Sequence, residues 1–378
     1  MDKKNKNPNV PNLRFSSFTN SYCVYTLGEI LQRVSNPVNI DENKLYYQIG
    51  IRSHSKGIFY KKAETGKQIG NKKIFWVESN CLILNIVFAW EQAVAKTSQK
   101  EIGMVVSHRF PMYKVLNNSL DYIVDFFKTE KGRQVLQMAS PGGAGRNKTL
   151  NQKFFLNSKV YLPSLKEQLI ISRFIALIEN RIETQIKIIS DHTSLKEGIY
   201  NLMFKENHAE FKLKELANIV KGKQINNDQL LSNGFYYMMN GGTSPSGYLN
   251  SYNVLENTIS VSEGGNSCGY VQFNNSKFWS GGHCYTIQDV NSILVDNKYL
   301  YHYLKYKEKE LMNLRIGTGL PNIQKKDLEN FMISVPSLLI QRKNLALLEM
   351  LDKKKCILNK ELQCLERQKK YLLCNMFI

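Results

Sequence analysis

Two long segments of the chain place apolar residues at steps of three and four, the spacing that lines one side of an α-helix. The first segment runs from 163 to 207 and the second from 336 to 378. Each opens with Pro-Ser, where the serine can cap the first turn, and neither contains another proline. The pattern predicts two uninterrupted helices of about 40 residues, each roughly 60 Å long.

Helices of this length need a partner for their apolar stripes, and the simplest partner is the other helix. We expect an antiparallel coiled coil, because two equivalent helices that pair along equivalent faces are related by a pseudo-two-fold axis. His192 interrupts the first apolar stripe, which is expected to continue through Leu195 and Leu202. Lys355 and Lys369 interrupt the second stripe. The residues expected in helix pairing or partner docking are Ile171, Ile175, Ile178, Ile182, Ile186, Ile189, Leu348, Leu351, Leu358, Leu362 and Leu365.

The two helical segments are copies of one pattern. The motif P-S-L-x-x-Q occurs at 163–168 and again, 173 residues later, at 336–341. Met-Phe occurs at 203–204 and again, at the same offset, at 376–377. Because no gap is needed between these two ends, the pattern indicates an internal duplication.

The repeat extends backwards into the block that precedes each helix. YTLGEI at 25–30 resembles FKLKEL at 211–216, and each block ends in a Gly-rich turn followed by Asn. Short strand-like runs such as IFWVES, LILNIVFAW, NTISVSE and GYVQF lie between these ends. We therefore expect an α+β fold made of a first globular domain at 1–162, a first long helix at 163–207, a second globular domain at 208–335 and a second long helix at 336–378.

The charge of the chain favours a polyanionic partner. Its 51 Lys and Arg against 32 Asp and Glu give a net charge of +19 and a pI near 9.4. Residues 1–160 carry 24 basic against 11 acidic side chains, a net of +13, whereas 207–333 carry 12 against 11, a net of +1. An antiparallel pairing would separate the two domains by less than about 60 Å, fewer than two turns of duplex at roughly 3.4 Å per base pair. A two-part DNA site fits this organisation.

The twin P-S-L-x-x-Q openings, the twin Met-Phe endings and PNLRFSSF at 11–18 resemble the specificity subunits of type I restriction-modification systems, and the resemblance covers essentially the whole chain. It implies two target recognition domains, each reading one half of a bipartite, gapped site in double-stranded DNA, and helices that set the gap. It also implies two docked methyltransferase subunits and ATP-dependent restriction subunits. This chain would bind no cofactor and no metal, while the partners would use S-adenosylmethionine, ATP and Mg²⁺.

Loops held on a rigid scaffold are where DNA-reading side chains usually project, and Arg suits guanine as Asn or Gln suits adenine. For any single residue, a solvated loop side chain or a turn former is the competing explanation. The two Gly-rich turns, at 140–148 and 316–326, are stronger candidates because they recur at matching places. The candidate DNA-binding residues are Arg52, His54, Lys56, Arg109, Arg146, Asn147, Lys148, Ser244, Tyr248, Asn266, Ser267, Asn322, Gln324 and Lys325.

No residue pattern indicates catalysis by this chain. It has no Walker A motif and no N/D-P-P-Y/F stretch, and the E-x-K triplet at 210–212 has no counterpart in the first block. Cys268, His283 and Cys284 lack a fourth ligand at zinc-like spacing, and the seven cysteines include no C-x-x-C pair. The N-terminus has no apolar run and the longest apolar stretch, 81–90, is too short to span a bilayer. We expect a cytoplasmic protein with free thiols.

A second interpretation stays open, in which the chain is a coiled-coil adaptor whose globular blocks bind proteins rather than DNA. The near-neutral second block favours it and the basic first block disfavours it. The sequence does not reveal the half-sites, the gap length or which loop residues touch bases.

Overall fold

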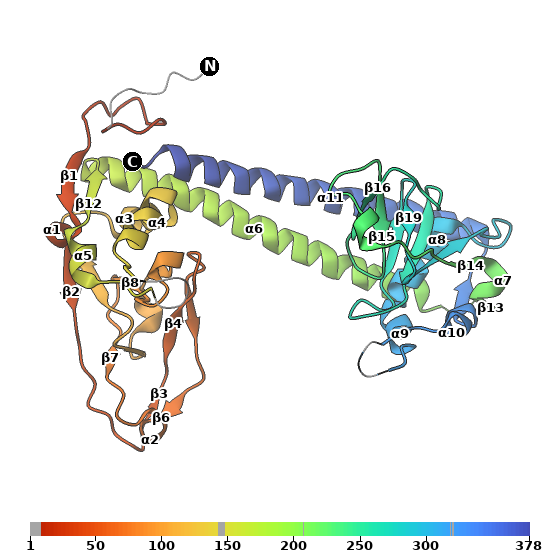
Figure 1. Cartoon of the computed structure of the whole chain (residues 1–378), viewed down its shortest axis with the longest axis horizontal. Helices are drawn as coiled ribbons and strands as arrows, with labels where there is room; N and C mark the ends of the chain where they lie inside the picture. Colours follow the sequence, from red (N-terminus) through yellow and green to blue (C-terminus); the bar gives the residue numbers. More distant parts are fainter. Residues whose placement is uncertain (1–8, 143–147, 207, 318, 320) are drawn as a thin grey trace. The chain divides into compact units, whose positions relative to one another are not determined.

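The computed structural model describes residues 9–142, 148–206, 208–317, 319 and 321–378. The chain forms two compact units, the first made of Met1–Gln185 with Glu361–Ile378 and the second of Ile186–Lys360. Each unit holds one α+β domain together with part of each of two long helices, α6 (Leu165–Phe204) and α11 (Leu338–Asn375) (Figure 1).

The first domain begins and ends on paired strands and carries its two longest helices late in the sequence. Its elements are β1 (Cys23–Thr26), α1 (Leu27–Ile30), β2 (Leu31–Val34), β3 (Leu45–Tyr46), β4 (Ile49–Ile51), β5 (Ile58–Tyr60), β6 (Glu64–Thr65), α2 (Gly66–Ile69), β7 (Ile74–Trp76), β8 (Leu82–Leu84), β9 (Val94–Lys96), β10 (Val105–Ser107), β11 (Met112–Val115), α3 (Leu120–Lys128), α4 (Glu130–Met138), α5 (Gln152–Asn157) and β12 (Lys159–Leu162).

The second domain repeats this plan with fewer strands among the described residues. Its elements are β13 (Ala209–Lys212), α7 (Leu213–Leu216), β14 (Asn218–Lys221), β15 (Tyr236–Met239), β16 (Gly247–Leu249), β17 (Thr258–Ser262), β18 (Val271–Asn274), β19 (Trp279–Ser280), β20 (Cys284–Gln288), α8 (Asn297–Tyr306), α9 (Glu308–Asn313), α10 (Lys325–Glu329) and β21 (Met332–Val335).

Both domains are built on the same antiparallel sheet. The strand order is β2-β11-β8-β9 in the first domain and β14-β20-β17-β18 in the second. In each, the opening strand also pairs with the closing strand, β1 with β12 and β13 with β21. The inserted strands differ: the pairs β3-β6, β4-β5 and β10-β7 belong to the first domain, and the sheet β16-β15-β19 belongs to the second. The duplication therefore preserved the core sheet and varied what is inserted in it.

A buried glutamine ties the first turn of each long helix to its own domain. The Gln168 amide accepts a hydrogen bond from the backbone N–H of Ser119 (2.9 Å) and donates one to the Pro163 carbonyl (2.9 Å). Gln341 makes the same contacts with Asp296 N–H (2.8 Å) and the Pro336 carbonyl (2.8 Å). Since Ser119 and Asp296 are the N-caps of α3 and α8, the motif P-S-L-x-x-Q is a helix-to-domain joint.

The far end of each long helix is held by aromatic packing. Phe204, at the end of α6, packs against Tyr299 of α8 with ring centroids 5.5 Å apart, in the core of the second unit. Phe377, just after α11, stacks on Tyr122 of α3 at 4.8 Å, in the core of the first unit. The repeated Met-Phe endings thus fill equivalent places, because Tyr122 and Tyr299 each lie three residues after their N-cap.

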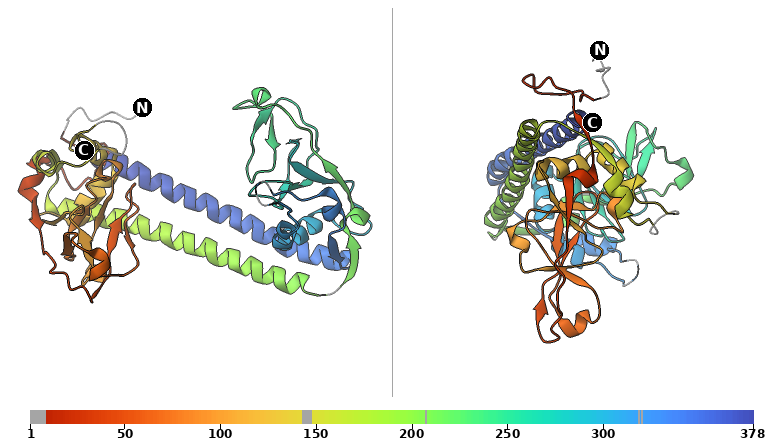
Figure 2. Two further views of the ribbon diagram at one scale, coloured as in Figure 1. Left: turned by 60° about the horizontal axis from the view of Figure 1, so that its bottom comes forward. Right: turned by 90° about the vertical axis from the view of Figure 1, so that its left-hand side faces the viewer.

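The long helices lie side by side and run antiparallel within each unit, as the views in Figures 1 and 2 agree. In the first unit Glu179 pairs with Lys369 (2.7 Å). In the second unit Asp352 pairs with Lys196. Glu179 and Asp352 are 173 residues apart, as are Lys196 and Lys369, so one ion pair occurs twice with its partners exchanged. The expected antiparallel coiled coil is confirmed.

The buried seam follows a strict seven-residue period, and this corrects one expectation. On α6 it passes through Ile171, Ile175 and Ile178 and then through the polar Gln185 and His192, both 9% exposed. Ile186 is 52% exposed and Leu195 and Leu202 are exposed as well, so these three residues lie off the seam, and for Ile186 partner docking stays the prediction. A prediction based on apolar residues alone leaves the seam at each position where the buried residue is polar.

The remaining residues expected in helix pairing lie along the seam. Ile182, Ile189 and Leu362 are partly buried, and Leu348, Leu351, Leu358 and Leu365 are buried. Lys369, which seemed to break the second stripe, instead directs its ammonium group to Glu179. Polar residues therefore belong to this interface rather than interrupt it.

Replacing Gln341 by Leu should destabilise the second unit by about 3 kcal/mol, because the Asp296 N–H and the Pro336 carbonyl would lose a buried partner, at ~1–3 kcal/mol each. Urea unfolding of the whole chain would measure the loss. Gln363→Leu, on the exposed side of the same helix, is the control and should change stability little. Equal effects of the two substitutions would contradict the joint.

Two isoleucines of α6 should respond very differently to aspartate. Ile175 is 0% exposed and Ile186 is 52% exposed. Ile175→Asp should cost about 3–5 kcal/mol, since it buries a carboxylate, whereas Ile186→Asp should stay within about 0.5 kcal/mol of the unaltered chain. Thermal unfolding followed by circular dichroism would compare them, and a similar loss for both would contradict the seam.

Candidate nucleic-acid interface

The two domains bring the same three segments together at one place. In the first domain the Ile86 N–H donates to the Arg109 carbonyl (3.0 Å), and the Leu150 N–H donates to the Ile86 carbonyl (2.8 Å). Ile86 follows β8, Arg109 precedes β11 and Leu150 follows the Gly-rich turn. This three-segment junction places Leu150, which follows the Gly-rich turn in the sequence, beside two loops from the core sheet.

The second domain repeats this junction with different residues. The Glu263 N–H donates to the His283 carbonyl (2.9 Å), and the Ile323 N–H donates to the Glu263 carbonyl (2.9 Å). Glu263 directly follows β17 and His283 directly precedes β20. Glu263 therefore corresponds to Ile86, and His283 corresponds to Arg109.

The junction of the second domain borders a hollow of about 490 Å³. The residues that line it are Asn240, Gly241, Gly264, Gly265, His283, Pro321 and Asn322. Gly241 and Gly265 have positive φ angles (78° and 75°), which residues with a Cβ rarely adopt. Backbone rather than side chains thus forms much of the wall, and a flat ligand can approach it closely.

Four candidate DNA-binding residues of the first domain lie on two loops. Arg52, His54 and Lys56 are exposed in the loop between β4 and β5, where the Arg52 guanidinium lies 5.7 Å from the Phe59 ring centroid. Arg109 is exposed at the three-segment junction.

The Gly-rich turn of the first domain contributes one described candidate. Lys148 is half-buried, with its ammonium 5.4 Å from the Trp90 ring centroid. Arg146 and Asn147 fall outside the described residues.

In the second domain the candidates fall into two groups. Ser244 and Tyr248 are exposed on and before β16, away from the lining of the hollow. Asn322 lines the hollow, and Gln324 donates to its side chain at 3.0 Å.

Three further candidates flank the second group. Asn266 is exposed, Ser267 donates to the Gly241 carbonyl (2.6 Å) and Lys325 pairs with Glu329. The loops at 241–250, 263–269 and 316–326 therefore meet, but not all of their candidate side chains do.

Sequence reasoning missed Glu263 and considered His283 only as a metal ligand. Glu263 is 7% exposed and accepts hydrogen bonds from Lys221 (2.7 Å) and from the Tyr285 hydroxyl (3.0 Å). Burial, together with this carboxylate, raises the pKa of Tyr285, so its hydroxyl stays a donor. Burial also raises the pKa of the Cys284 thiol to about 11. Within the part of the chain that the structure describes, no group of three His, Cys, Asp or Glu side chains could hold a metal ion.

The comparisons with known proteins all find type I specificity subunits. Residues 205–367 match the family model described as the type I restriction modification DNA specificity domain. A protein of Mycoplasma pneumoniae named as a type I specificity subunit is 34% identical over 121 residues, 32% of this chain and 32% of that relative. The alignment thus spans about a third of that curated relative.

Solved structures extend the likeness of fold to nearly the whole chain. The S subunit of a type I restriction-modification system from M. genitalium aligns with a TM-score of 0.66 and 16% identity, over 98% of this chain and 99% of that one. A chain from a structure of an assembled type I system aligns with a TM-score of 0.58 and 16% identity, over 93% and 96%. By the family model over residues 205–367 and by fold over nearly its whole length, the chain is similar to type I specificity subunits. The resemblance seen in the sequence is confirmed.

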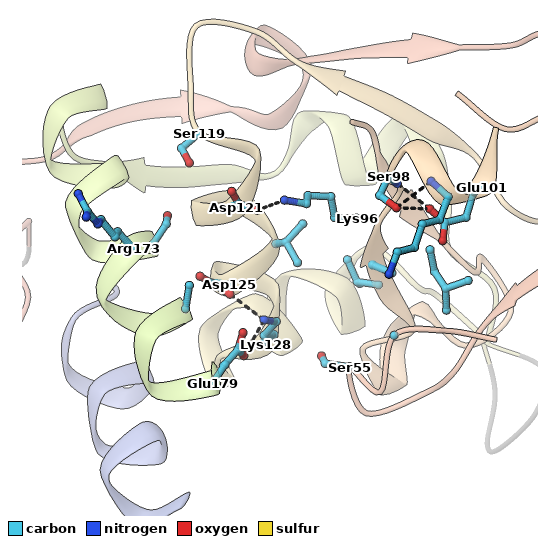
Figure 3. Close-up of a pocket in the computed structure, with 18 of the residues that line it drawn as sticks. Ser55, Lys96, Ser98, Glu101, Ser119, Asp121, Asp125, Lys128, Arg173 and Glu179 are labelled. Atoms are coloured by element: carbon cyan, nitrogen blue, oxygen red, sulfur yellow. Dashed lines mark hydrogen bonds and ion pairs between the residues drawn. The ribbon is translucent and has the colours of Figure 1, made fainter. Parts of the chain in front are cut away.

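In this specificity-subunit fold, a cleft of about 910 Å³ lies between α3, β9 and the first turns of α6 (Figure 3). Lys128 crosses it and donates to both Asp125 (2.8 Å) and Glu179 (3.0 Å). Burial raises the pKa of Asp125 to about 6, against the attraction of Lys128. The second unit has an equivalent cleft of about 490 Å³ beside α8 and α11.

His302 takes the place of Asp125 in the second unit. Both residues lie six positions after the N-cap of their helix. His302 contacts the Tyr200 hydroxyl through Nδ1 (2.9 Å) and lies 3.8 Å from Asp352. Burial, and next the charge of Lys196, lower the pKa of His302 to about 4, although Asp352 and Glu349 oppose the shift.

The long helices also expose apolar side chains that the seam does not cover. Leu177 is 54% exposed and its repeat equivalent Met350 is 59% exposed. Leu169, Leu195 and Leu202 are exposed on α6 as well. No helix among the described residues is long and apolar enough to cross a membrane.

The equivalent residues Asp125 and His302 should make the two units respond to acid in opposite directions. His302 takes up a proton only near pH 4 when folded but near 6.5 when unfolded, so the second unit should lose up to about 3 kcal/mol as the pH falls through this window. Asp125 has a raised pKa, so the first unit should gain stability between about pH 6 and 4.

Urea midpoints measured from pH 4 to 7 would test both signs. His302→Asn should remove the loss on acidification, and Asp125→Asn should remove the gain. An unchanged pH profile in either variant would contradict the corresponding assignment.

Proposed function

We propose that this chain is the DNA-reading subunit of a type I restriction-modification complex, in which each domain reads one half of a bipartite, gapped site in double-stranded DNA. The observation that carries the proposal is the three-segment junction, present once in each domain on the same core sheet but lined by different residues. One scaffold with two sets of loops suits two different half-sites.

The charge distribution supports different modes of binding in the two domains. The net charge of +13 in residues 1–160 favours salt-dependent attraction to phosphates, with Arg109, Lys148 and Arg52 exposed or half-exposed on that domain. The net charge of +1 in residues 207–333 suits recognition through neutral donors and acceptors. The same near-neutral charge is what favours the second candidate function, an adaptor whose domains bind proteins.

In this proposal the chain catalyses nothing and docks its partners on the long helices. The apolar side chains that the seam leaves exposed, such as Leu177 and Met350, support docking there. Two methyltransferase subunits would use S-adenosylmethionine, and restriction subunits would use ATP and Mg²⁺. The relative from M. genitalium is an S subunit of such a system, and that name supports the assignment.

Methylome sequencing of cells that hold the methyltransferase, with and without this chain, tests the proposal. A gapped, two-part motif should appear only with the chain. Arg109→Gln should then relax one base of a single half-site and leave the gap and the other half-site unchanged, because the two junctions lie on separate domains.

Arg133→Gln is the matched control, since Arg133 is on the same domain but pairs with Glu130 on α4. It should leave the motif intact. An active methyltransferase without any new motif would favour the adaptor, and a change in both half-sites from Arg109→Gln would contradict one reader per domain.

A further inference from the structure

The second domain holds a buried carboxylate of which only one oxygen has hydrogen-bond partners among the described residues. Glu263 directly follows β17 and is 7% exposed. Its Oε1 accepts from the Lys221 ammonium (2.7 Å) and from the Tyr285 hydroxyl (3.0 Å). Its Oε2 has no hydrogen-bond partner among the described residues. His283 Nδ1 lies 3.8 Å from Oε2, too far for a hydrogen bond.

An unpartnered carboxylate oxygen in such a place is costly. A carboxylate can only accept hydrogen bonds, and a buried acceptor without a donor loses the hydration it had in water. The fold does not require a carboxylate there, because the equivalent residue of the first domain is the apolar Ile86 in the same backbone contacts. The position therefore points to a donor that comes from outside the chain.

The surroundings of Oε2 limit what that donor can be. The His283 side chain is 65% exposed, has its Nδ1 3.8 Å from Oε2 and also lines the hollow of about 490 Å³. The glycines of the hollow allow a flat ring to approach the backbone. A phosphate is disfavoured beside a carboxylate, and the described residues provide no set of three metal ligands. A planar ligand with an N–H donor at its edge fits best.

We propose that Glu263 reads the exocyclic amino group of a cytosine or adenine in one half-site, with Oε2 as the acceptor and the His283 ring turned aside. This inference rests on the proposed function, since it assigns the base chemistry that the second domain selects. Glu and Asp accept from cytosine N4 in the major groove, and the adenine N6 amino group offers the same donor. Lys221 and Tyr285 hold Oε1, so the carboxylate is a positioned acceptor.

Methylome sequencing of the complex with Glu263→Gln provides the first test. Discrimination at one A·T or C·G pair of one half-site should fall by about ten- to a hundred-fold. The other half-site and the gap should stay as they are, and this also shows that the complex is folded. Glu256→Gln removes the same charge from an exposed loop of the same domain and should leave the motif unchanged.

Duplexes with single base analogues give the second test, once the motif is known. Purine in place of adenine, or 2-pyrimidinone in place of cytosine, removes the amino group at one position. The complex with the unaltered chain should lose about ten-fold or more in affinity at one position. With Glu263→Leu the same analogue should cause little further loss, because the acceptor is already absent.

The outcomes separate the two proposals. A gapped motif that Glu263→Gln leaves unchanged at every base overturns the role of Glu263 while the proposed function stands. Equal analogue losses with and without Glu263 at every position overturn it as well. The absence of any motif with the unaltered chain overturns both.

Discussion

The buried glutamine at the start of each long helix is the constraint on which the rest of the structure depends. Gln168 and Gln341 each join three backbone or side-chain groups while almost fully buried, so neither helix can rotate about its axis without losing them. The orientation of the first turn then decides which face of the helix enters the seam. At the far end of each helix a phenylalanine, Phe204 or Phe377, packs against a tyrosine of the opposite domain's core and fixes that end.

Because the shared contacts lie in the sheet, the joint and the seam, the loops are free to differ. The equivalent pairs Ile86 and Glu263, Arg109 and His283, and Asp125 and His302 show how far the chemistry has diverged on one scaffold. In the first domain the exposed basic residues carry a surplus of positive charge. In the second a buried carboxylate and neutral amides replace them. The two copies therefore share the contacts that stabilise the fold and differ in the side chains that their loops present.

The sequence predicted those features that depend on local periodicity or on the repeat. Both long helices, the β-rich blocks and the equivalence of Gln168 with Gln341 were visible in it. Glu263 and His283 were not, because their proximity follows from the register of β17 against β20, a pairing between distant parts of the chain. The seam was misplaced at Ile186 for a related reason: hydropathy alone does not show that Gln185 is the buried residue.

The polar residues of the seam explain why the helices pair in one register. An apolar seam of Ile and Leu with a seven-residue period tolerates a slip of one heptad, which moves one helix about 10 Å along the other. Such a slip would separate Glu179 from Lys369 and Asp352 from Lys196. Each pair is partly exposed and adds little stability, but two pairs related by the repeat must break together. If the helices set the gap between half-sites, 10 Å equals about three base pairs, so register is the property that such a spacer has to protect.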